Sequence, residues 1–312
     1  MKLKKRYIVL ISIILVLSIL LGVFFYLKNR DVVDTTDANM EFVINDTLED
    51  GNGEKVKVIL LAGQSNASGV AHTNELVKNI SEDKFLEYET GYENIFINYY
   101  NDNGSNKSSG FTNVKINQGC AEGYFGPELG MGEKLSQLYP NEKIFIIKYA
   151  WGGSNLHTQW DYKNGNLYKA FIKFAKESME YLESKNYDAE IVSMMWMQGE
   201  SDASPLYASN YKKNLTDMIA ALRKDLKDYI ASEGMYFIDA YISSSPYWIQ
   251  YKTINKAKQA VCDSSSLNIC VDTIEEGLTY DKEPTGNADL AHYDSLSEIK
   301  LGHLFIEAFA GI

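Results

Sequence analysis

VKVILLAGQSN, residues 56–66, joins a run of apolar residues to a tight turn that carries a serine. Near-continuous apolar residues are typical of a strand that is covered on both faces. Gly63 lets the backbone turn, so that Ser65 can project its hydroxyl from the edge of the sheet. The stretch therefore predicts a buried strand that leads to a candidate nucleophile, although a serine in this position is also a common helix cap.

Similar apolar runs recur along the chain and alternate with helical patterns. The alternation predicts an α/β fold, a three-layer α/β/α sandwich with a central parallel sheet, in which functional residues follow the carboxyl ends of the strands. The predicted strands are Val56–Leu61, Ile95–Tyr100, Ile144–Tyr149, Ile191–Met197, Tyr236–Tyr241 and Leu267–Val271. The predicted helices are Pro127–Leu138, two amphipathic segments near 167–182 and 211–226, and Leu296–Phe309, which Ser295 or Ser297 would cap.

The N-terminal segment predicts a membrane anchor. Tyr7–Leu27 is an uncharged, nearly all-apolar run, long enough as a helix to cross a bilayer. Four basic residues precede it and two follow it, which favours a cytoplasmic N-terminus and an exported body. No small-x-small cleavage site follows the run, so we expect an uncleaved transmembrane helix rather than a signal peptide.

These features divide the chain into three parts. We expect residues 1–30 to form the basic tip and transmembrane anchor, and residues 31–54 to form an acidic stalk in which Met40–Ile44 can be a short ordered piece. The globular domain is predicted to span residues 55–312. We expect it to lie outside the cytoplasm, where Cys262 and Cys270 can form a disulfide or remain free thiols.

The charge balance excludes one class of partner. The chain has a formal net charge of −12, and residues 1–30 contain no acidic residue, so the exported part is still more acidic. An acidic surface repels phosphate backbones, so nucleic acid is not an expected partner.

Asp289 and His292 form the second candidate constellation. A spacing of three places a carboxylate and an imidazole on one side of a turn, where the carboxylate can fix the tautomer of the ring. A histidine at the start of the last helix can also be purely structural. Of the other histidines, His303 lies within that helix and is expected to be structural, while His72 and His157 lie in loops and can touch substrate.

Two further segments follow predicted strands. Gln198 offers a side-chain N–H for an oxyanion. Glu200 and Asp202 beside it can be a metal-binding pair, a general acid and base, or struts, meaning side chains whose hydrogen bonds hold the loop in place. We prefer the interpretation as struts. Trp151-Gly152-Gly153-Ser154 lets the backbone approach the site closely, and Trp151 and Trp160 can form a sugar-stacking wall or belong to the core.

Taken together, these segments resemble those of the SGNH hydrolases, and more narrowly those of the sialate O-acetylesterase and acetyl xylan esterase group, carbohydrate esterase family six. The segments occur in the family's order over residues 55–310, and they are Gly63-Gln64-Ser65-Asn66, Gly126-Pro127-Glu128, Gly152-Gly153-Ser154, Gln198-Gly199-Glu200-Ser201-Asp202 and Asp289-x-x-His292. The glutamines at 64 and 198 fit the narrower group better than the lipase-like branch.

The resemblance implies a role for each matching residue. Ser65 matches the nucleophile, His292 the general base and acid, and Asp289 the carboxylate that orients it. The remaining matches form the oxyanion hole and the substrate contacts, with either of two glycines completing the hole. They are the N–H of Ser65, Gln198, Gly126 or Gly153, Gln64, Asn66 and Glu200.

The resulting hypothesis is a serine esterase that removes acetyl groups from a carbohydrate without a metal or an organic cofactor. An alternative is a glycan-binding module without catalysis on the same scaffold. A third hypothesis, a metal-dependent glycosidase or phosphatase using Glu200, Asp202 and Asp289, lacks an accompanying set of histidine ligands. The sequence does not identify the sugar.

Overall fold

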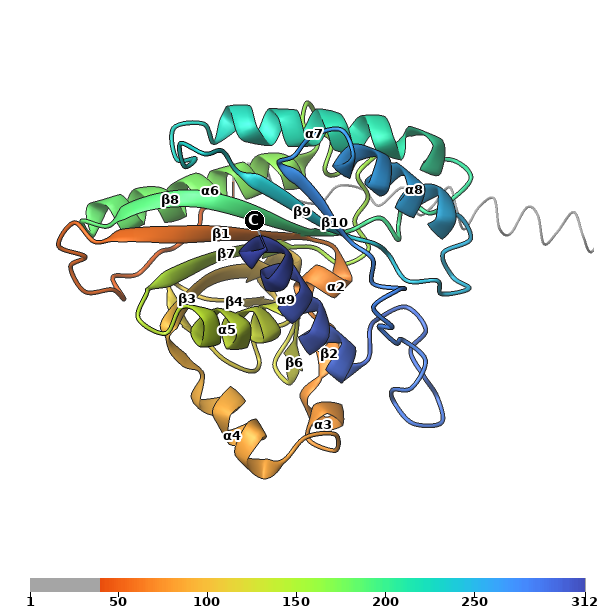
Figure 1. Ribbon diagram of the computed structural model, residues 1–312, viewed down its shortest axis with the longest axis horizontal. Coiled ribbons are helices and arrows are strands. Elements are labelled where there is room, and N and C mark those ends of the chain that lie inside the picture. The colour runs from red at the N-terminus through yellow and green to blue at the C-terminus, as the bar shows by residue number, and fades with distance from the viewer. Residues whose placement is uncertain (1–39, 312) are drawn as a thin grey trace, which may run out of the picture. The chain divides into compact units, whose positions relative to one another are not determined.

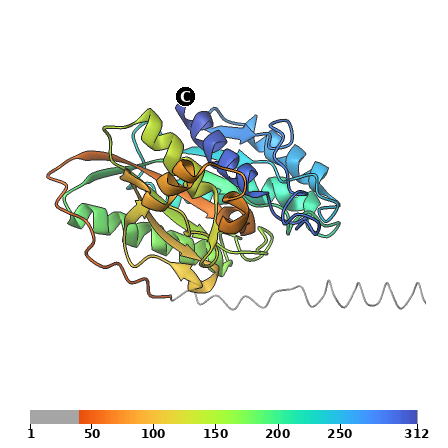
Figure 2. The same cartoon turned by 90° about the horizontal axis from the view of Figure 1, so that it is seen from below.

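The computed structural model describes residues 40–311, whose helices and strands are shown in Figures 1 and 2. The predicted membrane span, Tyr7–Leu27, lies outside these residues, as does the first part of the predicted stalk. Within residues 40–311, no helix is both long enough and apolar enough to cross a bilayer.

Strand β1 (Lys55–Gly63) lies in the middle of the sheet, between β7 (Ile144–Ala150) and β8 (Asp188–Met197). Both neighbours run parallel to it. Further parallel strands extend the sheet on both sides, in the order β10-β9-β8-β1-β7-β3, and they are β3 (Tyr92–Asn101), β9 (Tyr236–Ala240) and β10 (Asn268–Val271). All six predicted strands are confirmed, and their carboxyl ends meet at one edge of the sheet.

The sheet is mixed rather than wholly parallel, which corrects the predicted arrangement at one end. Strands β4 (Asn106–Lys107) and β5 (Thr112–Val114) both pair antiparallel with β3. Asp102 and Asn103 have φ values of 44° and 60°, so the chain turns back directly after β3. Asn101–Gly110, which its turn-forming residues predict as a loop, therefore contains a short strand.

Helices cover both faces of the sheet, as the three-layer prediction requires (Figure 1). Helices α6, α7 and α8 lie on one face, and α5 and α9 lie on the other. Their bounds are α5 Pro127–Leu138, α6 Asn166–Ser184, α7 Tyr211–Asp225, α8 Tyr251–Cys262 and α9 Ser295–Ala310. Helix α8, like β4 and β5, had no sequence prediction. Further elements without one are α2 Ser65–Ser68, α3 Thr73–Leu76, α4 Glu82–Thr90, the 3-10 helices Asp102–Gly104 and Ala208–Asn210, and the two-stranded antiparallel pair of β2 Ala71–His72 and β6 Tyr124–Phe125.

Helices α5 and α9 cross so closely that glycine is needed on each. A Cβ atom on Gly130 would lie 2.0 Å from the carbonyl oxygen of Ile299, and one on Gly302 would lie 2.1 Å from that of Pro127. No side chain fits in that space. The crossing fixes where α9 begins, and therefore where the preceding loop, which carries His292, meets the sheet.

The start of α9 is stabilised from outside the helix, so the prediction that Ser295 or Ser297 caps it is wrong. The N-cap residue is Asp294, whose side chain makes no capping hydrogen bond. The carboxylate of Glu283 instead accepts hydrogen bonds from the N–H of Ser295 at 2.7 Å and from its hydroxyl at 2.8 Å. A carboxylate at a helix N-terminus is also favoured by the helix dipole.

Residues 40–54, predicted as part of a solvated stalk, pack against the domain. The ring of Phe42 lies 4.8 Å from that of Phe174 and 5.1 Å from that of Tyr100, measured between centroids. The backbone N–H of Asn45 donates to the carbonyl oxygen of Ser109, and the N–H of Gly51 to that of Lys185. These contacts make residues 40–54 a strap on the folded body, which thus begins before the predicted boundary at Lys55.

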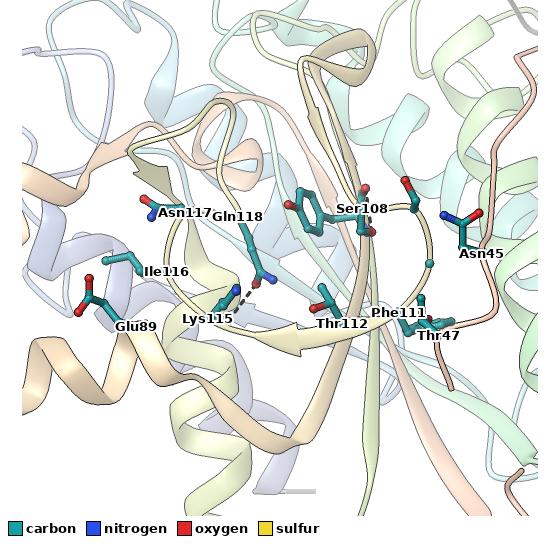
Figure 3. A pocket seen from close by; sticks show the side chains of 13 residues that line it. Asn45, Thr47, Glu89, Ser108, Phe111, Thr112, Lys115, Ile116, Asn117 and Gln118 are labelled. Carbon is teal, nitrogen blue, oxygen red and sulfur yellow. Dashed lines mark hydrogen bonds between the residues drawn. The ribbon is translucent and has the colours of Figure 1, made fainter. Parts of the chain in front are cut away.

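A polar hollow lies between this strap and the segment that carries β4 and β5 (Figure 3). Asn45 and Thr47 of the strap line it together with Ser108, Thr112 and Gln118. None of the residues predicted for the catalytic site lines this hollow.

Cys262 and Cys270 form a disulfide that links the end of α8 to β10, while Cys120 is free. The sequence allows either a disulfide or free thiols at Cys262 and Cys270, and the structure contains the disulfide.

The crossing of α5 and α9 predicts a strong effect of one methyl group. Gly302→Ala should lower the free energy of unfolding by about 1–3 kcal/mol, because the added Cβ overpacks the contact. Gly311→Ala, at the end of the same helix, is the matched control, since the nearest atom to a Cβ there lies 3.3 Å away. Urea unfolding midpoints of both variants test this, and equal midpoints would contradict the tight crossing.

Candidate active site

Ser65 stands directly beyond the carboxyl end of the central strand, as predicted. A Cβ atom on Gly63, whose φ is +146°, would lie 1.9 Å from the carbonyl oxygen of Met197, so only glycine fits there. The next N–H, that of Gln64, donates to the same oxygen at 2.9 Å. Helix α2 begins at Ser65, and its first N–H donates no hydrogen bond within residues 40–311.

His292 and Asp289 form the predicted pair. The ring Nδ1 of His292 lies 2.6 Å from Oδ2 of Asp289, whose Oδ1 accepts from the N–H of Ala291. Burial raises the pKa of Asp289, but the hydrogen bonds from His292 and Ala291 outweigh it and hold the pKa below its ordinary value. The ionised carboxylate makes Nδ1 the donor, which leaves Nε2 as the basic nitrogen of the neutral ring.

Asn66 joins the serine turn to the histidine loop. Its side-chain Oδ1 accepts a hydrogen bond from the backbone N–H of Tyr293 at 3.1 Å, and its Nδ2 donates to Oε1 of Glu200 at 2.8 Å. Asn66 is only 2% exposed. The residue after Ser65 is therefore bonded to the residue after His292, across more than two hundred positions of the sequence.

The turn after β7 lies against Ser65. A Cβ atom on Gly152 would lie 3.8 Å from the Cβ of Ser65. The N–H of Gly152 donates to Oδ1 of Asp102, whose Oδ2 accepts from the hydroxyl of Ser68 at 2.5 Å. The next N–H, that of Gly153, donates no hydrogen bond to any of the described residues. Two unpaired N–H groups, those of Ser65 and Gly153, thus belong to neighbouring turns.

Asp102, which the sequence analysis did not identify, fixes the turn after β7 relative to the turn that carries Ser65, because it bonds both Gly152 and Ser68. Its position could have identified it, since Asp102 directly follows β3 and functional residues are expected at the carboxyl ends of the strands. The surrounding Asn, Gly and Ser residues indicated only a loop.

Gly126, predicted as one of two glycines for the oxyanion hole, has its N–H engaged. That N–H donates to Oε1 of Glu128 at 2.8 Å. The other carboxylate oxygen accepts from Nζ of Lys148, a fully buried cation that also donates to the carbonyl oxygen of Ser68. This group supports α2 from beneath, so the geometry favours Gly153 over Gly126 as the donor.

Gln198 is fully buried and its amide is used within the protein. Nε2 lies 2.7 Å from Oδ2 of Asp202, 3.1 Å from the carbonyl oxygen of Ser154 and 3.3 Å from Oε1 of Gln64. The amide oxygen accepts from the hydroxyl of Tyr211. Because both hydrogens of Nε2 have acceptors nearby, the predicted oxyanion role of Gln198 gains no support, and neither does a direct substrate contact for Gln64.

Glu200 and Asp202 fit the preferred interpretation as struts. Glu200 accepts from Asn66, and Asp202 accepts from the backbone N–H groups of Leu156 and His157 as well as from the amide of Gln198. Burial raises the pKa of Asp202 to about 6, against the lowering effect of these hydrogen bonds. Within residues 40–311, no three His, Cys, Asp or Glu residues are grouped to hold a metal ion, so the metal-dependent hypothesis gains no support.

The remaining candidates separate into core and surface. Trp160 is fully buried against Trp196 and so belongs to the core. His303 contacts Glu133 of α5 at 3.0 Å, which confirms its structural role. His157 stacks on Tyr207 with ring centroids 4.6 Å apart.

A pocket of about 460 Å³ opens beside His292 and Asp289. Segments that are distant in the sequence form it. They are β2 with the start of α3, β6, the segment after β9 and the segment before α9. The residues that line it are Val70, Ala71, His72, Glu75, Tyr124, Tyr247, Glu283, Pro284, Asn287, Ala288, Asp289, His292 and Tyr293.

Similar proteins have related sequences and folds. A probable carbohydrate esterase of Arabidopsis thaliana is 24% identical over 263 residues, which are 81% of this chain and 90% of the relative. The crystal structure of that Arabidopsis protein has a TM-score of 0.59 at 20% identity, with 82% of this chain and 98% of that chain covered. The structure of NanS has a TM-score of 0.60 at 16% identity, with 85% and 98% covered.

A family model described as carbohydrate esterase, sialic acid-specific acetylesterase, matches residues 55–311. The matched range contains every segment on which the resemblance rests, from Gly63 to His292. Because the match spans most of the chain, the protein belongs to this family of carbohydrate esterases and is a carbohydrate O-acetylesterase.

Proposed function

We propose that the chain hydrolyses O-acetyl esters of a carbohydrate through an acyl-enzyme, with Ser65 as nucleophile, His292 as general base and acid, and Asp289 as the carboxylate that orients the ring. The observation that carries the proposal is the hydrogen bond from the N–H of Tyr293 to Oδ1 of Asn66, which joins the nucleophile turn to the histidine loop.

The first step forms the acyl-enzyme. Nε2 of His292 takes the proton of the Ser65 hydroxyl as the serine oxygen attacks the acetyl carbonyl carbon. The carbonyl oxygen becomes an anion, which the N–H groups of Ser65 and Gly153 stabilise. The sugar oxygen then leaves with the proton held by His292, and the acetyl group remains on Ser65.

The second step releases acetate. Water loses a proton to Nε2 of His292 and attacks the acetyl carbonyl, and the same N–H groups stabilise the oxyanion again. Collapse of the intermediate breaks the bond to Ser65, which recovers its proton from His292. Throughout, Asp289 remains ionised and supports the imidazolium, as its lowered pKa favours.

We further propose that Tyr7–Leu27 anchors the chain in the cell membrane as a single span, with the esterase domain outside the cytoplasm. The disulfide between Cys262 and Cys270 supports this placement, because such bonds persist mainly in oxidising compartments. The excess of basic residues before the apolar run supports the same orientation.

Replacement of the nucleophile tests the mechanism. Ser65→Ala should abolish turnover of an acetylated xylo-oligosaccharide and of 4-nitrophenyl acetate, since no oxygen remains to form the acyl-enzyme. Ser232→Ala, at an exposed serine far from the site, is the control and should keep wild-type rates. Acetate release and unfolding midpoints are the measurements. Wild-type rates in Ser65→Ala would exclude the mechanism, and sugar binding by a wild-type protein without turnover would favour the non-catalytic binding module.

Asp102 should act as a positioning residue. Asp102→Ala removes the acceptor that holds the Gly152 N–H, so kcat should fall about tenfold to a hundredfold while KM changes little. Asp102→Asn keeps an acceptor oxygen and should restore most of kcat. Steady-state kinetics on 4-nitrophenyl acetate separate the two parameters, and an unchanged kcat in Asp102→Ala would remove Asp102 from the proposal.

The membrane topology can be tested in cells. We expect the chain to remain with the membrane fraction after salt and alkaline washes, and intact cells to deacetylate a polysaccharide that cannot enter them. Deletion of residues 1–30 should release the chain from the membrane fraction. Activity that emerges only after lysis would contradict the outward orientation.

A further inference from the structure

The pocket beside His292 combines aromatic surfaces with hydrogen-bonding groups. The rings of His72 and Tyr124 contact each other at its wall, with centroids 4.1 Å apart and planes tilted by 40°, and Tyr247, which is 60% exposed, also lines it. Exposed rings present flat apolar surfaces to the C–H faces of a sugar, while the side chain of Asn287 offers a donor and an acceptor to hydroxyls.

The charged groups of the pocket are acidic. Glu75, Glu283 and Asp289 line it, and among the described residues that do so there is no lysine or arginine. Glu283 is bonded to the start of α9, and Glu75 pairs with Nζ of Lys78 at 2.7 Å. A neighbouring hollow does contain Lys78 and Lys282, but the carboxylates of Glu75, Glu283 and Asp294 line it as well. Lys78 is therefore paired with a carboxylate, and three carboxylates line the same hollow as Lys282.

The described part of the chain also lacks a guanidinium group that is free to bind an anion. Residues 40–311 contain one arginine, Arg223. It is on α7 and donates to the carbonyl oxygens of Met235 and Leu267 and to Oδ1 of Asn268. A sugar carboxylate is usually held by arginine or by a charge-assisted hydrogen bond from another cation. A sialic acid placed in this pocket would meet carboxylates instead.

We propose that this pocket is the subsite for an uncharged sugar, and that the preferred substrate is a neutral O-acetylated glycan rather than an O-acetylated sialic acid. The proposal rests on the esterase function proposed above. It departs from the sialic acid specificity in the description of the family.

Comparison of two substrates tests the preference. The full chain should hydrolyse acetylated xylo-oligosaccharides with a kcat/KM about tenfold or more above that for 9-O-acetyl-N-acetylneuraminic acid, because like charges repel in the pocket. Added salt should raise kcat/KM for the sialate and leave that for the neutral sugar nearly constant, since ions screen the repulsion.

A single added cation tests whether this pocket causes the preference. Asn287 is exposed at the pocket, and its side chain makes no hydrogen bond within residues 40–311. Asn287→Lys should raise the ratio of kcat/KM for the sialate to that for the neutral sugar by about fivefold. Ser232→Lys adds the same charge far from the site and should leave the ratio unchanged. Using a ratio cancels any effect of the new charge on His292 itself.

The outcomes separate this inference from the proposed function. Equal or faster turnover of the sialate, still abolished by Ser65→Ala, would overturn the neutral-sugar proposal and leave the esterase mechanism in place. An unchanged ratio in Asn287→Lys would overturn the assignment of the sugar to this pocket. Turnover of both substrates by Ser65→Ala would instead refute the proposed function.

Discussion

One buried asparagine, Asn66, holds together the two halves of the proposed catalytic site. Ser65 belongs to the central strand's turn and His292 to the loop before the last helix, and chain connectivity does not bring them together. The amide of Asn66 bonds both the N–H of Tyr293 and the carboxylate of Glu200. Loss of this side chain would leave a buried N–H and a buried carboxylate oxygen without that partner, each at a cost of about 1–3 kcal/mol. Such a bond fixes one arrangement of the two segments and disfavours others.

The backbone beneath this contact is equally constrained. Gly63 lies so close to the carbonyl oxygen of Met197 that β1 and β8 end in a defined register, and Lys148 supports α2 from inside the sheet. Lys148 and Glu128 form a buried ion pair at 2.7 Å, and removal of either partner would leave an uncompensated charge in the core. The proposed nucleophile therefore stands on a turn that the close contact at Gly63 and the hydrogen bond from Lys148 hold in place, which suits a site that must not reorganise during the reaction.

Much of the fold follows from patterns that lie within single segments of the sequence. The six parallel strands are apolar runs covered on both faces, and α5 begins at Pro127 as a proline at the first helical position predicts. The features that escaped prediction depend on distant partners. The start of α9 is bonded by Glu283 rather than by its own serines, and residues 40–54 are held by Phe174 and Ser109. The acidic residues of the strap predict that this segment is solvated when it is considered alone. They do not predict that the surface around Phe174 and Ser109 binds it.

The site shows the same limit more sharply. Position at the end of a strand identified Ser65, Gly153, Gln198 and Glu200 together, because the fold delivers all of them to one edge of the sheet. Position does not reveal which polar group retains a free hydrogen. The N–H groups of Ser65 and Gly153 are unpaired among the described residues, whereas the amide of Gln198 is consumed by Asp202 and Ser154. A donor already bonded in a buried loop can serve a substrate only by breaking that bond, so free hydrogen-bonding capacity separates the groups proposed to react from those that hold them in place.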